Sequence, residues 1–266
     1  MGFLKQSPLR LDLYLVEKGY VATREKAQAL IMAGLVLVDG KVVSKPGTKI
    51  KEGQRLEVKE LPKYVSRAGY KLEGALERFG INVENMIALD VGSSTGGFTQ
   101  CLLMHGAKKV YAVDVGRGQM DPNIRNDPRV VLYEETDARE LTEKHIPERV
   151  DIITVDVSFI SVLKVLPNVL KFLKEEGILL VLVKPQFELE PKKVKKGIVR
   201  EASYKKEAII KVVEFLRSFG LKIGGIMKAK PKGTKGNEEF FLFAGKNIQE
   251  IKYIDMMVED ALREVL

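Results

Sequence analysis

The stretch IALDVGSSTGGF, residues 87–98, joins a short apolar run to a glycine-rich turn and the start of a helical segment. This order of strand, turn and helix is typical of the ligand-binding corner of a doubly wound α/β fold. Glycine lets the backbone turn sharply and approach a nucleotide-like ligand closely. Strand-to-helix turns also use glycine for purely structural reasons, so the stretch needs support from its surroundings.

The spacing of the glycines indicates which ligand fits. A dinucleotide fingerprint has a second glycine two residues after the first, but here Ser94 stands two residues after Gly92. The turn is therefore poor for NAD. It fits S-adenosylmethionine (SAM) better, because SAM has no pyrophosphate.

Acidic residues end or follow the next two expected strands. Asp114 closes the segment 111–114, where a carboxylate can accept both ribose hydroxyl protons. Asp137 follows the segment 130–133 and could accept an adenine amino proton. Either acid could instead be a helix N-cap, but suitable groups at three successive strand ends favour a ligand site. The predicted cofactor ligands are Asp90, Gly92, Ser94, Gly96, Gly97, Phe98, Asp114, Asp137 and Asp156.

Strand-like and helix-like segments alternate through the rest of the chain. A helical pattern begins at residue 67, and further helices are expected at 96–105, 159–173 and 204–219. Apolar strands are expected at 86–91, 110–113, 130–133, 151–155, 178–183, 221–227 and 240–243. This alternation predicts a Rossmann-like α/β domain, with a parallel sheet covered by helices on both faces. The tail 251–266 is spaced as a helix that we expect to pack onto this domain, with binding to a partner as the alternative.

The N-terminal sixty residues have a different pattern. Helices are expected at 11–16 and 24–33, the second with Thr23 as its N-cap. Asp39-Gly40 between β-branched runs predicts a hairpin, and 55–58 is a last strand. We therefore expect a small α+β domain at 8–60, a linker at 61–66 and the α/β domain at 67–266.

Composition narrows the class of protein. The chain has 266 residues and a formal net charge of +8, which favours nucleic acid or an anionic membrane as partner. One cysteine, Cys101, excludes an intramolecular disulfide, and two histidines leave little material for a zinc site or a Ser-His-Asp triad. No metal is predicted. No segment approaches the ~20 apolar residues of a membrane helix, and no signal peptide is evident, so the expected compartment is the cytoplasm.

Several long stretches resemble the TlyA family. They are DVGSSTGGFT (90–99), YAVDVGRGQM (111–120), VDVSFIS (155–161) and LVKPQFE (182–188), with SRAGYKL (66–72) and GNEEFF (236–241). That family is described both as haemolysin and as ribosomal-RNA cytidine 2′-O-methyltransferase, with an FtsJ-type catalytic domain. Residues 10–12, 27–33 and 34–40 are similar to an S-four-like RNA-binding domain.

The resemblance implies an activity and a site. The activity is SAM-dependent methylation of a cytidine 2′-hydroxyl in ribosomal RNA (rRNA), 23S and possibly 16S, within ribosomal subunits. The lysine–aspartate–lysine–glutamate set of FtsJ-type enzymes falls on Lys71, Asp156, Lys184 and Glu239. Glu238 adjoins Glu239, and if 240–243 is a strand these two glutamates point to opposite faces.

The chemistry suits these residue types. A ribose hydroxyl becomes a good nucleophile only as its proton leaves, and a neutral lysine can accept that proton. Desolvation and nearby cations, such as Lys71 and the sulfonium of SAM, favour the neutral form of Lys184. Asp156 would oppose this effect while directing the amine. Taken alone, Lys184 could instead be a strand-end lysine whose amine reaches water.

Basic residues near the predicted site and in the N-terminal domain are candidates for binding RNA phosphates. The same charges could be ordinary solvated surface groups. The candidates are Arg10, Arg24, Lys26, Lys41, Lys192, Lys193, Lys195, Lys196, Lys232 and Lys235.

Other classes of function stay open at this point. A non-enzymatic RNA-binding ribosome-assembly factor would not need all four residues of the catalytic set. A membrane-lytic haemolysin is supported by no membrane span and by no strong amphipathic β pattern, although the C-terminal helix could lie on a membrane. A NAD-dependent oxidoreductase is disfavoured by Ser94.

Overall fold

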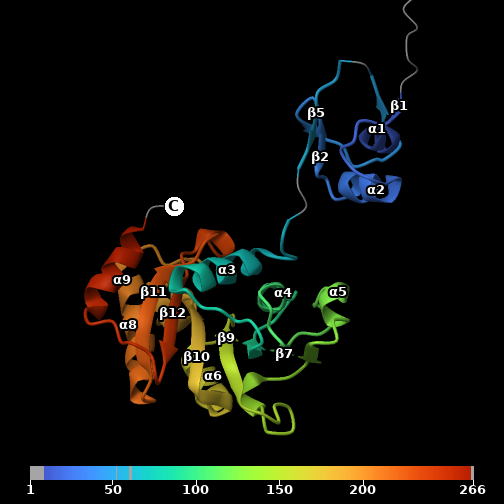
Figure 1. The fold of residues 1–266 in the computed structure, drawn as a ribbon. Coiled ribbons are helices and arrows are strands. Elements are labelled where there is room, and N and C mark those ends of the chain that lie inside the picture. The colour runs from blue at the N-terminus through green and yellow to red at the C-terminus, as the bar shows by residue number, and fades with distance from the viewer. Residues whose placement is uncertain (1–8, 52, 60–61, 265–266) are drawn as a thin grey trace, which may run out of the picture. The chain divides into compact units, whose positions relative to one another are not determined.

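A seven-stranded sheet forms the centre of the larger part of the molecule in a computed structural model (Figure 1). Its order is β11-β12-β10-β9-β6-β7-β8, so the direction of winding reverses at β6, as in doubly wound folds. The strands are β6 (Ile87–Val91), β7 (Lys109–Val113), β8 (Val130–Tyr133), β9 (Val150–Val155), β10 (Leu173–Val183), β11 (Lys222–Lys228) and β12 (Phe240–Gly245).

The structure describes residues 9–51, 53–59 and 62–264, and the chain divides into two units, 1–63 and 64–266. Pro8, Glu60, Leu61 and the last two residues, at which expected segments begin or end, lie outside the described residues. Within the segment expected as a linker, Tyr64 is buried in the second unit, where its ring packs edge-on against Tyr70. Each unit is considered by itself below.

The expectation of an all-parallel sheet was wrong for one strand. β12 pairs antiparallel with both β10 and β11, whereas the other pairs are parallel. The reason is the connection from β11 to β12, which contains only the short 3₁₀ turn η4 (Thr234–Gly236) and no crossover helix. Without a crossover, consecutive neighbouring strands must run in opposite directions.

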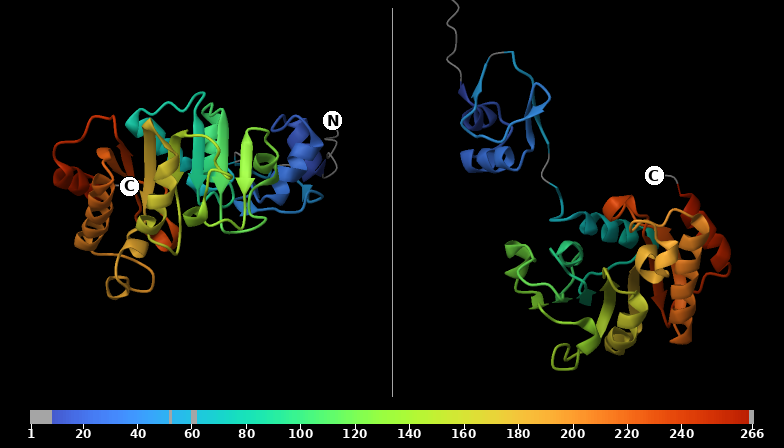
Figure 2. Two further views of the ribbon diagram at one scale, coloured as in Figure 1. Left: turned by 90° about the horizontal axis from the view of Figure 1, so that it is seen from below. Right: turned by 180° about the vertical axis from the view of Figure 1, so that it is seen from behind.

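Helices cover both faces of the sheet, as predicted (Figure 2). On one face α6 (Val162–Val169), α8 (Ala202–Ser218) and α9 (Ile254–Arg263) pack against the strands. On the other face lie α3 (Arg67–Phe79) and α4 (Gly97–Met104), with the short α5 (Pro122–Arg125). Smaller helical turns are η1 (Ala138–Glu140), η2 (Leu170–Phe172), α7 (Pro185–Glu188) and η3 (Pro191–Lys193).

The helix expected at 159–173 is much shorter in the structure. Phe159 has a left-handed φ of 64°, and Ser161 caps α6 by accepting a hydrogen bond from the Leu163 amide. The far end turns into η2, and Leu173 already belongs to β10. Phe159 and Ile160 are thereby freed to line cavities beside the sheet edge.

The C-terminal helix packs onto the sheet domain, as expected. Ile254, Val258 and Ala261 of α9 are buried against β11 and α8. The buried Lys228 at the end of β11 donates to the carbonyls of Leu262 (3.0 Å) and Glu264 (2.9 Å). A lysine here satisfies carbonyls that the helix end leaves free.

The N-terminal unit contains two helices and small sheets. α1 (Leu11–Glu17) and α2 (Arg24–Met32) pack on each other, and the Thr23 side chain caps α2 as predicted. β2 (Val36–Val38) and β3 (Lys41–Val42) form the predicted hairpin, in which Asp39 and Gly40 both have positive φ. β5 (Leu56–Val58) pairs with β2, and the unpredicted β1 (Leu9–Arg10) pairs with β4 (Lys49–Ile50).

Candidate active site

The glycine-rich turn after β6 is shaped by two close approaches. Gly92 has a φ of 84°, and a Cβ there would lie 2.4 Å from the carbonyl oxygen of Asp156. A Cβ on Gly97 would lie 2.2 Å from Ser66 Oγ, where the start of α4 meets the start of α3. Only glycine fits at these positions, so the ends of β6 and β9 and the two helix starts converge on one spot.

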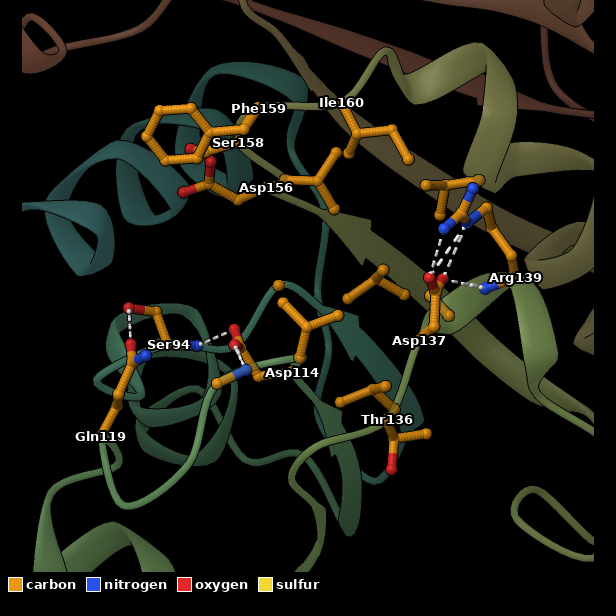
Figure 3. A pocket seen from close by; sticks show the side chains of 18 residues that line it. Ser94, Asp114, Gln119, Thr136, Asp137, Arg139, Asp156, Ser158, Phe159 and Ile160 are labelled. Atoms are coloured by element: carbon orange, nitrogen blue, oxygen red, sulfur yellow. Dashed lines mark hydrogen bonds and ion pairs between the residues drawn. The ribbon is translucent and has the colours of Figure 1, made fainter.

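A cavity of about 540 Å³ lies beyond the carboxyl ends of β6, β7, β8 and β9 (Figure 3). Asp114, Asp137 and Asp156 line it from three different strand ends. Asp114 is held by two backbone amides, accepting hydrogen bonds from Ser94 N (2.8 Å) and Gly116 N (2.7 Å). A carboxylate has about four acceptor positions, so Asp114 keeps lone pairs for a ligand.

The carboxylate of Asp137 is already engaged. The Arg139 guanidinium forms an ion pair with it at 2.6 Å, and the Arg139 amide donates to it at 2.9 Å. These contacts lower the pKa of Asp137, chiefly through the side-chain hydrogen bonds from Arg139. Asp137 is therefore a fixed anion on the cavity wall, and the sequence did not reveal its arginine partner.

Asp90 lies beneath the cavity and does not line it. Its side chain is fully buried and accepts hydrogen bonds from Thr99 Oγ1 (2.6 Å) on α4 and Thr154 Oγ1 (3.0 Å) on β9. Burial raises the pKa of Asp90 to about 7, against the opposing effect of the two threonine hydroxyls. Its geometry is that of a brace between strands and helix.

A second cavity of about 350 Å³ adjoins the first and brings together all four residues of the expected catalytic set. Lys71, Asp156, Lys184 and Glu239 come from α3, β9, β10 and the approach to β12. Of the other expected ligands, Gly97 and Phe98 line this second cavity, and Gly96 lines neither. The two cavities share the residues Gly92, Ser94, Asp156 and Ser158.

Lys184 stands between an acid and a hydroxyl. Its Nζ lies 2.6 Å from Asp156 Oδ1 and donates a hydrogen bond to Ser158 Oγ at 2.8 Å. The contact with Asp156 is ionic in character, because Oδ1 accepts no directed hydrogen bond there. The Lys184 side chain is only 11% exposed, so the amine at the end of the buried strand is held by protein partners and does not extend into water.

Lys71 and Glu239 form the second ion pair of the cavity, with 2.5 Å between Lys71 Nζ and Glu239 Oε2. Glu238 faces elsewhere, as the strand geometry predicted, and pairs with Lys205 at 2.7 Å and Lys228 at 3.5 Å. The structure thus brings Glu239, and not its neighbour, to the cavity.

Three residues near the site had been given no role from sequence. Ser158 accepts the Lys184 hydrogen bond, and Arg67 lines the second cavity while donating to the Lys232 carbonyl at 3.4 Å. Phe159 is 93% exposed at the mouth of the first cavity. Ser158 and Phe159 lie within the stretch VDVSFIS, so their nearness to Asp156 was the available signal.

Two lysine-rich segments of the sequence, 191–197 and 228–235, come close to each other near Glu239. Asn237 donates to the Gly197 carbonyl (2.8 Å) and accepts from the Val199 amide (3.3 Å). Among the described residues the exposed Lys195, Lys196 and Lys235 form no ion pair, whereas Lys192 pairs with Glu190, Lys193 with Glu207, and Lys232 lies 3.7 Å from Glu238.

Two of the expected RNA-binding arginines in the N-terminal unit hold a buried acid. Asp12 is fully buried and pairs with Arg10 (2.9 Å) and Arg24 (3.0 Å), with Gln28 donating at 3.1 Å. Hydrogen bonds from Arg10 above all keep the pKa of Asp12 well below its usual range. Both arginine side chains remain nearly half exposed, and Lys26 and Lys41 are exposed.

No described helix is long and apolar enough to cross a membrane, and the described residues contain no cluster of metal-ligating side chains.

Comparisons with known proteins agree with this architecture. Residues 64–246 match the FtsJ-like methyltransferase family and residues 9–56 match the S4 domain family. The chain is 40% identical over 237 residues to the Mycobacterium tuberculosis protein named "16S/23S rRNA (cytidine-2'-O)-methyltransferase TlyA", covering 88% of both chains. It is 44% identical over 234 residues to "Hemolysin A" of Brachyspira hyodysenteriae, covering 87% of this chain and 98% of that one.

A solved structure of a Streptococcus thermophilus protein named as a hemolysin has the same fold, with a TM-score of 0.73 and 38% identity. The match covers 97% of this chain and 96% of that chain. Together with the two adjoining cavities at the strand ends, these similarities show that the chain belongs to the TlyA family of FtsJ-like methyltransferases, with an S4 domain at its N-terminus.

Proposed function

We propose that this protein transfers a methyl group from SAM to the 2′-hydroxyl of a cytidine in ribosomal RNA. The observation that carries the proposal is the pair of adjoining cavities that share Asp156, one lined by fixed acids and the other by the two lysine–acid pairs. Such an arrangement suits a donor and an acceptor that meet at one point. The Mycobacterium tuberculosis relative is named for this reaction.

The size of the first cavity and the hydrogen-bond acceptors that line it suit SAM. A volume of about 540 Å³ lies within the usual range for ligand pockets. Asp114 would hold the ribose hydroxyls, and Asp137, anchored by Arg139, would face the adenine amino group. Gly92 would let the backbone approach the ligand. When bound, SAM supplies an electrophilic methyl group on a sulfonium centre.

Lys184 would accept the proton of the attacking hydroxyl. Its Nζ is fixed by Asp156 and Ser158 at the junction of the two cavities. A group held in this way needs little reorganisation as the proton moves, and general bases typically contribute about 10²–10⁴-fold to a rate. Asp156 directs the amine and balances the positive charge that it gains.

Lys71 and Glu239 would place the ribose. Their ion pair has side-chain exposures of 9% and 4%, so each holds the other in one orientation. Ordered hydrogen-bonding groups around the acceptor favour a near-attack geometry. Arg67 and the exposed Lys195, Lys196 and Lys235 would position the RNA backbone, and the S4 domain would add affinity for structured RNA.

The substrate that we propose is rRNA within ribosomal subunits, in the cytoplasm, and both 23S and 16S rRNA are candidates because the M. tuberculosis relative is named for both. The measurement is transfer of tritiated methyl from SAM to isolated large and small subunits, with the modified nucleotide mapped. Release of dye from liposomes in parallel would instead favour a lytic activity.

Lys184→Arg tests the base role, because arginine keeps the charge and does not deprotonate. We expect it to lose nearly all transfer while SAM binding, measured by calorimetry, is retained. Lys205→Arg is the matched control, since Lys205 is similarly buried and paired with an acid but lies outside both cavities. Near-normal turnover of Lys184→Arg would refute the base role.

A further inference from the structure

A groove lies next to the two cavities of the proposed active site. It has a volume of about 440 Å³, and Phe159 and Ile160 line both this groove and the first cavity. Its other walls include Gln186 and Phe187, which follow Lys184 in the chain, and Lys164 on α6. The loops that carry Asp156 and Lys184 therefore form the groove as well as the site.

The groove has an aromatic wall. The rings of Phe159 and Phe187 lie 5.4 Å apart at 51°. Phe159 is 93% exposed and holds a left-handed backbone conformation with φ 64°, which is costly for an aromatic residue. Such strain is characteristic of functional loops, and an exposed aromatic face suits a planar ligand.

The polar groups of the groove suit a nucleotide. Lys164 is exposed, and its side chain makes no ion pair or hydrogen bond with the described residues. Gln186 Oε1 is shielded from solvent without a donor among those residues, so a small rotation would offer an unused acceptor to a base amino group.

The acids of the groove are already engaged by protein groups. Glu188 is buried and accepts hydrogen bonds from Ser161 (2.5 Å) and the Val162 amide (2.9 Å). Glu190 pairs with Lys192 at 2.7 Å. Lys211 donates to the Glu188 carbonyl at 2.8 Å, so Lys164 is the lysine of the groove whose side-chain donors are all free of the described residues, and it is the first candidate for a phosphate.

We propose that this groove binds the RNA nucleotide next to the methylated one, with its base against Phe187 and its phosphate near Lys164. The inference rests on the proposed function, since it takes RNA as the acceptor. The groove shares Phe159 and Ile160 with the first cavity, and Ser158, which precedes Phe159 in the chain, lines the second cavity, so a bound nucleotide would lie next to the proposed site of transfer. The groove would thus recognise a neighbour of the target by stacking, without contributing to the chemical step.

The test combines protein variants with altered RNA substrates and measures kcat/KM for each pair. Once the target is mapped, an RNA oligonucleotide carrying it is compared with oligonucleotides that lack the base on one side or the other. We expect wild-type kcat/KM to fall about 5- to 100-fold for one of the two, the scale of a lost base–aromatic stack. Phe187→Leu should lose a similar factor on the intact RNA and little more on the abasic one.

Lys164→Gln provides a second variant at an exposed site, and Lys171→Gln is its control, an exposed lysine outside the groove. We expect Lys164→Gln, but not Lys171→Gln, to raise the KM for RNA several-fold without changing kcat or SAM affinity. If Phe187→Leu and the missing base each lowered kcat/KM and their factors multiplied when combined, the two would act independently, and the assignment would be overturned. So would an unchanged KM in Lys164→Gln. A wild-type protein that methylates no RNA would instead refute the proposed function itself.

Discussion

Replacement of Asp90 by asparagine should make the free energy of unfolding less dependent on pH. Asp90 is fully buried, and burial raises its pKa to about 7 from an ordinary 3.8. The unfolded chain therefore loses this proton near pH 4, while the folded protein keeps it until about pH 7. Because the unfolded state gives up its proton first, stability falls as the pH rises between these values.

The size of the effect follows from the two pKa values. At about 1.36 kcal/mol per pKa unit, the difference between 3.8 and about 7 corresponds to about 4 kcal/mol at high pH. Between pH 5 and pH 8, linkage gives a decline of about 2–3 kcal/mol. Asparagine does not ionise, so the free energy of unfolding of Asp90→Asn should lack this decline. Relative to the wild type, the variant should therefore become more stable by about 2–3 kcal/mol from pH 5 to pH 8, whatever the stability difference at pH 5.

Urea denaturation at pH 5 and pH 8 measures this gain. The chain has no tryptophan, so circular dichroism is the suitable signal. Asp137→Asn is the control: the pKa of Asp137 is lowered by Arg139, so its carboxylate is ionised in both states throughout this interval. A stability difference between Asp90→Asn and wild type that is the same at both pH values would refute the reasoning.

Three further outcomes are expected. Glu239→Gln should lower kcat for methyl transfer by at least about 10-fold by breaking the buried pair with Lys71, while Glu238→Gln changes it little; equal losses in a turnover assay would contradict the placement of Glu239. Asp12→Asn should destabilise the N-terminal unit by about 1–3 kcal/mol in thermal denaturation, because it removes the charge that Arg10 and Arg24 bind. The loss is limited because both half-exposed arginines can still hydrogen-bond to water. RNA binding should weaken steeply between about 50 and 200 mM salt, as expected for several phosphate contacts. Neutralising the lysines at 192–196 should make this salt dependence shallower.

Local patterns predicted much of the structure. The turn at 92–97 was found because close backbone approaches leave glycine as the only choice, and such positions are visible in the sequence. The Thr23 cap of α2 and the Asp39-Gly40 hairpin depend on neighbouring residues, so they too were predicted. The resemblance to FtsJ-type enzymes implied that Lys184 and Asp156 belong to one site, and they lie together because parallel strands present their carboxyl ends at one edge.

Features that depend on distant residues were missed. The reversed direction of β12 follows from the lack of a crossover helix between β11 and β12, although the sequence already placed no helix between residues 227 and 240. Asp90 had the position of a ligand, but Thr99 and Thr154 turn it into a buried brace. Arg10 was expected on RNA, yet part of its hydrogen-bonding capacity is used on Asp12.

The hydrogen bonds from Lys228 to the carbonyls at the end of α9 affect how experiments with C-terminally shortened chains should be interpreted. A chain ending before Leu262 removes both acceptors from an ammonium group that is only 4% exposed, leaving it next to Glu238. Glu238 faces away from the second cavity, so trimming the tail should lower the stability of this domain by leaving the buried ammonium with fewer acceptors. Full-length Lys228→Met removes the same two hydrogen bonds with the helix present, but it also removes the ammonium group, so comparing it with a deletion separates the lost hydrogen bonds from the stranded charge.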